Sequence, residues 1–131
     1  MDNLSRNEME ALRVLWNENP LKPAQIQERF SWFIENSTLR SVLRNLVDRK
    51  YLKRRKKGKA FYYRVKIRQQ SVLSNMVKYM AHVFSQGSTT DLVAQFIKNE
   101  ELSEEEMREL REIVESTSST KSSDRKARGK P

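Results

Sequence analysis

The chain has 131 residues, no cysteine, and 26 Lys or Arg against 17 Asp or Glu, which gives a formal net charge of +9. This length allows one compact domain with an appended assembly element, because short segments bury too little surface to be stable alone. The lack of cysteine excludes disulfides, thiolate metal sites and thiol catalysis. The positive charge indicates a polyanionic partner, either nucleic acid or an anionic membrane surface.

The sequence also bears on cellular location. No apolar run approaches the roughly 20 residues that are needed to span a bilayer. The first ten residues, MDNLSRNEME, lack the hydrophobic core of a signal peptide. We therefore expect a cytoplasmic protein with no membrane insertion.

Two short helices are predicted first. Ser5 and Glu8 have the spacing of a capping box, in which each side chain bonds a free backbone N–H of the other residue. This spacing predicts a helix over residues 6–17. Pro23 suits the first position of a second helix, over residues 23–30, because the N–H that proline lacks has no helical partner there.

A third helix is predicted over residues 37–50, capped by Asn36 or Ser37. Its apolar residues follow helical spacing along one stripe. The other face carries small polar and guanidinium side chains: Ser37, Thr38, Arg40, Ser41, Arg44 and Asn45. Arg can bond a guanine bidentately, Asn an adenine, and Ser or Thr a base or a phosphate. Any surface helix has a polar side, so this face indicates base contacts only together with the segment that follows.

That segment, residues 49–68, contains eleven Lys or Arg and no acid. Apolar and polar residues alternate in its second half, which is typical of a strand with one buried face. Gly58 supplies a turn, so a basic hairpin is predicted over residues 52–66, with Arg55, Lys57 and Lys59 on phosphates. We expect the alternation to bury two of the three aromatic residues there. The predicted fold is mainly α with a small β-hairpin wing, and residues 1–68 form a winged helix-turn-helix that binds double-stranded DNA.

The spacing of apolar residues over 69–115 predicts three more helices, each with one apolar stripe. Capping-box spacing recurs at Ser88 with Asp91 and at Ser103 with Glu106. Three such helices are too thin a set to fold alone, so a second copy of the chain should cover them in a homodimer. The stripe residues that we expect at this interface are Met76, Met80, Phe84, Phe96, Leu110 and Ile113.

Residues 116–131 have a different composition. Seven of the eight residues from 116 to 123 are Ser or Thr, and basic residues follow. Such a segment lacks the large apolar side chains that offset the entropy of ordering, so we expect a disordered basic tail.

The sequence also bears on functions other than DNA binding, namely catalysis, RNA binding and protein contacts. An enzyme is disfavoured because the chain has one histidine, no cysteine and no Gly-rich phosphate loop. We therefore expect no catalytic residue, no metal and no cofactor. The carboxylates after residue 100 follow helix-start signals and indicate a solvated helix face. An RNA-binding module that stacks bases on the wing aromatics, or a winged helix used for protein contacts, remains the alternative.

Four pieces of sequence, in order, resemble the penicillinase-repressor family of bacterial winged-helix regulators. They are EALRVLW at 10–16, TLRSVLRNL at 38–46, KGKAFYY at 57–63, and LVAQF at 92–96 followed by ELSEE at 101–105. The first three are similar to the family's first helix, recognition helix and wing. The last resembles its dimerisation region.

The resemblance implies a homodimeric transcriptional repressor on a palindromic operator, relieved when a membrane-sensor metalloprotease pathway cuts its C-terminal half. The cut would fall between Gln95 and Phe96. The sequence departs from the family pattern at Asn45, where Arg is frequent, and at Tyr51, where glycine is common. We expect these changes to preserve the fold and to alter the operator sequence.

Overall fold

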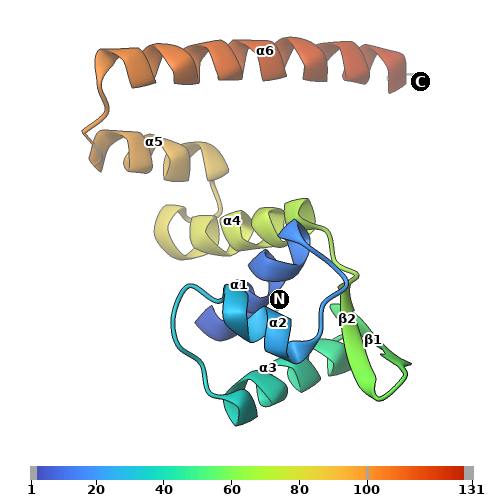
Figure 1. Ribbon diagram of the computed structural model, residues 1–131. Coiled ribbons are helices and arrows are strands. Elements are labelled where there is room, and N and C mark those ends of the chain that lie inside the picture. Colours follow the sequence, from blue (N-terminus) through green and yellow to red (C-terminus); the bar gives the residue numbers. More distant parts are fainter. Residues whose placement is uncertain (1–2, 100, 129–131) are drawn as a thin grey trace.

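The computed structural model describes residues 3–99 and 101–128, with side chains described as far as residue 117. Figure 1 shows a compact head, made of the N-terminal helices and a hairpin, from which the C-terminal helices lead away. The elements in chain order are α1 (Arg6–Asn17), α2 (Pro23–Arg29), α3 (Asn36–Asp48), β1 (Leu52–Lys57), β2 (Ala60–Val65), α4 (Gln69–Ser85), α5 (Thr89–Asn99) and α6 (Glu104–Arg128). The predicted class, mainly α with a two-stranded wing, is confirmed.

The first helix begins where its capping box predicts. The Glu8 backbone N–H donates to Ser5 Oγ at 3.1 Å, and the Ser5 N–H donates to Glu8 Oε1 at 2.8 Å. Its apolar side chains at residues 11, 12, 14 and 15 are fully or almost fully buried, and the helix packs against α3. The largest fully buried side chains come from all parts of the head: Leu12, Leu15, Ile26, Leu39, Leu43, Leu46 and Leu52. Burying each contributes roughly 1.5–3 kcal/mol, so the head is held by one shared core.

The start of α3 differs from the prediction. Neither Asn36 nor Ser37 caps the helix, because both lie inside its first turn and Glu35 occupies the N-cap with extended backbone. The Asn36 side chain instead accepts a hydrogen bond from Arg40 Nε at 3.2 Å. The helix ends two residues earlier than predicted, and Lys50 follows with a left-handed φ of 66° that turns the chain into β1.

The wing is an antiparallel pair in which Leu52 lies opposite Val65 and Lys57 lies opposite Ala60. Gly58 has a φ of +67°, the conformation that the predicted turn requires. The base of the wing is fixed by two backbone hydrogen bonds between Leu21 and Tyr63, at 3.1 and 2.8 Å.

The expected burial of the wing aromatics was wrong in part. Tyr63 is buried, Tyr62 is half-buried, and Phe61 is 38% exposed. Phe61 lies near the tip of the hairpin, beyond the core, where the Arg54 guanidinium lies 4.7 Å from the centre of its ring. Strand alternation determines which face a residue occupies, but burial of that face needs a neighbouring element.

The C-terminal helices also begin at their predicted caps. The Asp91 N–H donates to Ser88 Oγ at 3.0 Å, and Ser103 and Glu106 exchange both capping-box bonds. Helix α6 continues to Arg128, so residues 116–128, whose composition predicts disorder, are helical in the structure. Extending a helix is easier than starting one, because each added residue gains a hydrogen bond without a new nucleus. Residues 129–131 of the predicted tail lie outside the described part.

None of the helices described is both long enough and apolar enough to cross a membrane.

Candidate nucleic-acid interface

Helix α3 separates its two faces as its sequence predicts. Its apolar residues are buried against the rest of the head, and Leu39, Leu43 and Leu46 have no exposed surface. All six residues proposed to contact bases are exposed on the outer face: Ser37, Thr38, Arg40, Ser41, Arg44 and Asn45. The structure thus places these side chains together on one accessible surface.

A groove of about 570 Å³, here called the α3–wing groove, runs between α2, α3 and the hairpin. Arg40 and Arg44 enter it from α3, and Lys59 enters it from the turn of the wing. Lys22 and Arg54 complete a set of five cations, and no carboxylate of the described residues lines the groove. Positive charge in a concave surface focuses the field and attracts a polyanion.

Arg54 was not singled out from the sequence, although it belonged to the run of basic residues assigned to the wing. It lies opposite Tyr63 in the strand register, so its side chain is on the same face of the hairpin as that buried ring. Its contact with the ring of Phe61 holds the guanidinium beside α3. The sequence did contain a signal for this. Side chains alternate along a strand, so residue 54 lies on the same face as the buried Leu52.

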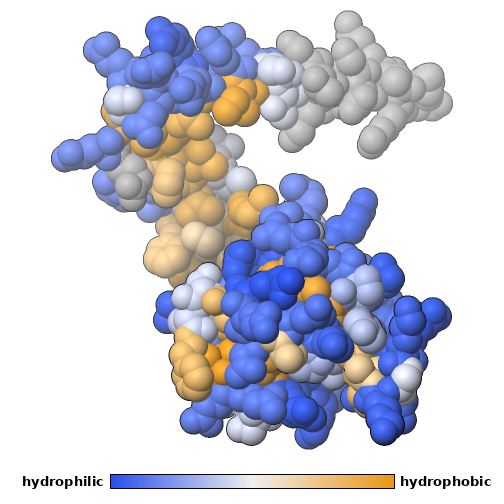
Figure 2. Space-filling view, in the orientation of Figure 1, coloured by the Kyte–Doolittle hydropathy of each residue, from blue (hydrophilic) through white to orange (hydrophobic). Residues whose placement is uncertain are grey.

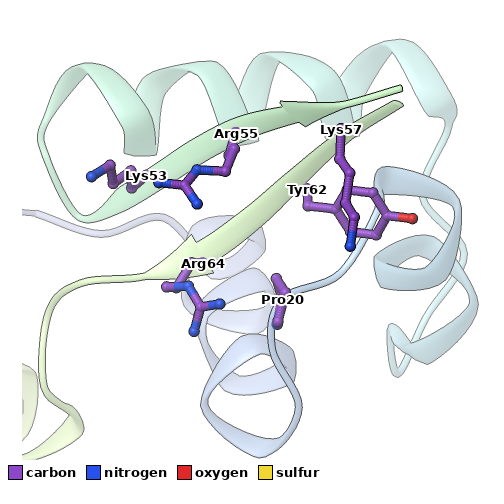
Figure 3. Close-up of a pocket in the computed structure, with 6 residues that line it drawn as sticks. All are labelled: Pro20, Lys53, Arg55, Lys57, Tyr62 and Arg64. Carbon is purple, nitrogen blue, oxygen red and sulfur yellow. The ribbon is translucent and has the colours of Figure 1, made fainter. Parts of the chain in front are cut away.

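The outer face of the wing is a second basic surface, and Figure 3 shows its side chains together with Pro20 of the α1–α2 link. The hairpin residues that line this shallow cavity of about 340 Å³ are Lys53, Arg55, Lys57, Tyr62 and Arg64. Lys53 lies directly opposite Arg64 in the register, an arrangement of like charges that destabilises a strand pair. Among the described residues, none of these four cations forms an ion pair. A bound anion would relieve that repulsion.

The three predicted phosphate contacts are therefore divided between the two faces. Lys59 lines the α3–wing groove, whereas Arg55 and Lys57 lie on the outer face. The sequence did not distinguish them, because all three are basic residues of the same segment.

The end of α3 is tied to α1 by an ion pair. Arg49 Nη1 lies 3.2 and 3.3 Å from the two oxygens of Glu8, whose carboxylate is buried and also caps α1. The guanidinium of Arg49 lies 5.0 Å from the centre of the Tyr51 ring. One carboxylate thus fixes both the start of α1 and the end of α3, which orients the exposed face of α3.

The start of α3 is held through the α2–α3 link, residues 30–35. Arg13 donates to both oxygens of Glu10 at 3.0 and 2.7 Å, and the Ser31 N–H donates to Glu10 Oε2 at 2.7 Å. The Arg13 hydrogen bonds lower the pKa of Glu10 to about 2; burial opposes this shift and the Ser31 bonds add to it. Glu10 therefore keeps its charge, and its hold on the link, at neutral pH.

The six predicted dimerisation residues lie on α4, α5 and α6, and they differ in exposure. Phe84 is 63% exposed and Phe96 is 61% exposed, while Met80 and Ile113 are also exposed. Met76 and Leu110 are half-buried. In Figure 2, hydrophobic surface gathers over α4 and α5, in contrast to the hydrophilic head. Exposed apolar area of this kind marks an interaction surface.

The predicted cleavage pair lies within α5. Gln95 Nε2 donates to Ser85 Oγ at 2.9 Å and to the Phe84 carbonyl oxygen at 3.2 Å, so it joins α5 to the end of α4. Phe96 projects from the exposed side of the same helix.

The described helices, wing and basic groove define a winged-helix protein of the DNA-binding class. The family model of the penicillinase repressor matches residues 4–116, and the chain belongs to that family. The penicillinase repressor of Staphylococcus aureus is 24% identical over 108 residues, which cover 81% of this chain and 86% of that protein. The penicillinase repressor of Bacillus licheniformis is 25% identical over 110 residues, which cover 81% of this chain and 84% of that protein. The family places the chain among repressors of transcription.

Two solved structures share the fold. The transcriptional regulator Tm0710 of Thermotoga maritima superposes with a TM-score of 0.51 at 11% identity, over 98% of this chain and 81% of that one. BpsR of Bordetella bronchiseptica superposes with a TM-score of 0.50 at 14% identity, over 87% of this chain and 75% of that one. The DNA binding of BpsR is regulated by 6-hydroxynicotinic acid.

Proposed function

We propose that the chain is a homodimeric repressor that binds a palindromic operator, with α3 in the major groove and the wing on phosphates. The observation that carries this proposal is the α3–wing groove, where five cations converge and none of the described lining residues is a carboxylate. Base-reading and phosphate-binding groups would then lie side by side, as a winged helix-turn-helix requires.

The roles divide by position. Thr38, Arg40, Ser41 and Arg44 are exposed along α3 and would read base edges, together with Ser37 and Asn45. The wing would bind phosphates from both of its faces, through Arg54 and Lys59 on one and Arg55 and Lys57 on the other. Phosphate contacts supply affinity and orientation, and base contacts supply sequence preference.

Dimerisation is proposed through α4, α5 and α6. Their exposed apolar residues, with Phe84 and Phe96 the most prominent of the aromatics, would be covered by the same surface of a second copy. Two heads related by a twofold axis match a palindromic site.

Relief of repression is proposed to follow a cut between Gln95 and Phe96 by a membrane-sensor protease pathway. Because this bond lies inside α5, the helix must open locally before a protease can act. The cut would separate α6 from the rest of the interface, so each head would lose the effective concentration that its partner supplies. Operator affinity should then fall by about 10²-fold or more.

A protease site engineered between Ala94 and Ile97 tests this step. The full-length protein is cut on the operator, and operator retention and dimer content are measured before and after. A cut protein that stays dimeric and bound would require induction by another event, such as a ligand or a partner protein.

The DNA-binding function itself is tested by selection of duplexes from a random pool with the purified protein. The expected product is an inverted repeat with half-sites about 10–10.5 base pairs apart, or a multiple of that spacing. Single-stranded RNA is offered as a competitor, because the half-buried Tyr62 and exposed Phe61 are the residues that an RNA-binding module would use for stacking. Enrichment of no duplex, or displacement by RNA at equal concentration, would reject the proposal.

A further inference from the structure

Phe33 lies in the α2–α3 link and is 83% exposed, more than any other large hydrophobic residue that the structure describes. A hydrophobic ring in water is unfavourable, so its exposure is informative where the backbone could have turned it inward. The residues on either side of Phe33 are both held in place.

Trp32 is fixed from three directions. Its Nε1–H donates to Asn7 Oδ1 at 2.9 Å, the Arg6 guanidinium lies 4.2 Å from the centre of its ring, and the Phe30 ring meets it edge-on at 5.8 Å. This side of the link therefore cannot move without breaking contacts to α1.

Ile34 is buried in the core, and its carbonyl oxygen accepts a hydrogen bond from Gln27 Nε2 at 2.8 Å. On the other side, the N–H of Ser31 is held by Glu10. The link is thus anchored before and after Phe33, so the ring is presented to solvent by a fixed backbone. A backbone held in this way loses little conformational entropy on binding.

The position of Phe33, just ahead of α3, points to DNA as its partner. Two residues after it, Glu35 caps α3, and the exposed residues Ser37 and Thr38 occupy the first turn of that helix. In a helix-turn-helix the N-terminal part of the recognition helix approaches base edges. Thymine presents a methyl group in the major groove, and apolar side chains recognise it by contact.

We propose that Phe33 packs against the C5-methyl group of a thymine at the edge of each operator half-site and gives the protein a preference for thymine there. This inference rests on the proposed DNA-binding function. It adds an apolar contact outside α3 to the polar contacts along that helix.

The test combines protein and DNA substitutions in the full-length protein. Affinities of the wild type, Phe33→Ala and Phe33→Leu are measured on the selected operator and on duplexes in which one thymine pair at a time is replaced by deoxyuridine, which lacks the methyl group. At one of these positions, deoxyuridine should weaken binding by the wild type and leave binding by Phe33→Ala unchanged. The expected loss is about 4-fold per half-site, the equivalent of one buried methyl-sized group. Phe33→Leu should retain most of the affinity.

Thermal unfolding and sedimentation of each variant show whether fold and dimer are preserved. Equal operator affinity of Phe33→Ala and the wild type would overturn the inference. So would a loss of affinity in Phe33→Ala that is the same with thymine and with deoxyuridine at every position. A loss of affinity that is explained by dissociation into monomers would overturn it as well. If the wild type selects no duplex, the proposed function and this inference fall together. If the wild type selects an operator and Phe33→Ala binds it equally well, this inference alone fails.

Discussion

Trp16 Nε1 donates a hydrogen bond of 2.9 Å to the carbonyl oxygen of Ile67, a residue 51 positions later in the chain. The bond joins α1, in the centre of the head, to the segment between the wing and α4. It fixes the point at which the C-terminal helices leave the head, and this point sets how two heads would be spaced in a dimer.

Trp16→Phe keeps an aromatic ring in place and removes this bond, so the free energy of unfolding should fall by about 0.5–1.5 kcal/mol. Hydrogen exchange should become faster in the first turn of α4. Trp32→Phe is the matched control, because it loses its bond to Asn7 without touching this junction. Equal exchange in the two variants would show that Trp16 does not hold the junction.

Arg55→Ala with Lys57→Ala tests the outer face of the wing. Each neutralised phosphate releases about one counterion, so the double substitution should weaken binding to all duplexes alike and flatten the salt slope by about 2 per head. Lys78→Ala with Lys98→Ala removes the same charge from exposed positions on α4 and α5 and should leave the slope unchanged. An unaltered slope in the wing variant would remove this face from the interface.

Arg40→Ala and Arg44→Ala test the reading of bases by α3. Each should cost roughly 1–3 kcal/mol on the selected operator if the guanidinium binds a guanine bidentately, and less on random DNA. Fluorescence anisotropy on the two duplexes measures the difference. Equal losses on both would assign that arginine to a phosphate.

Phe84→Glu should convert the proposed dimer to a monomer, because it places a charge within the exposed apolar surface of α4. Sedimentation velocity measures the change, and circular dichroism checks that helix content is kept. His82→Glu, at an exposed position on the same helix, introduces the same acid without removing an apolar group. If Phe84→Glu still sediments as a dimer, the interface lies elsewhere.

Acid should destabilise the head through Glu10. Its pKa is about 2 in the folded protein and 4.5 as the ordinary value, so its stabilising contribution is complete above pH 4.5 and is lost as the pH falls towards 2. Glu10→Gln should lower the free energy of unfolding at neutral pH by about 1–3 kcal/mol and reduce the dependence on pH in this range. Urea unfolding at pH 7, 4 and 3 provides the comparison. A Gln variant with undiminished acid sensitivity would place the titrating group elsewhere.

Local sequence signals located most of the elements. The capping boxes at Ser5, Ser88 and Ser103 mark the starts of α1, α5 and α6, because a cap depends only on residues three positions apart. The signals were less reliable where several local choices had similar energy. The residue that caps α3 is one example, since neighbouring residues could serve equally well there. The end of α6 is another, since extending a helix and leaving the chain disordered differ little in free energy.

The sequence by itself determined the order and type of the helices and strands, the inner and outer faces of α3, and the basic character of the wing, because each depends on composition and periodicity within one segment. Only the tertiary structure decided that the face of the wing that carries Arg54 shares a groove with α3, since this depends on how α2 and α3 pack against the hairpin. It also decided that Phe33 is held in solvent, because its anchors lie on α1 and α2. Contacts between distant segments depend on packing, and packing has no signature in a single stretch of sequence.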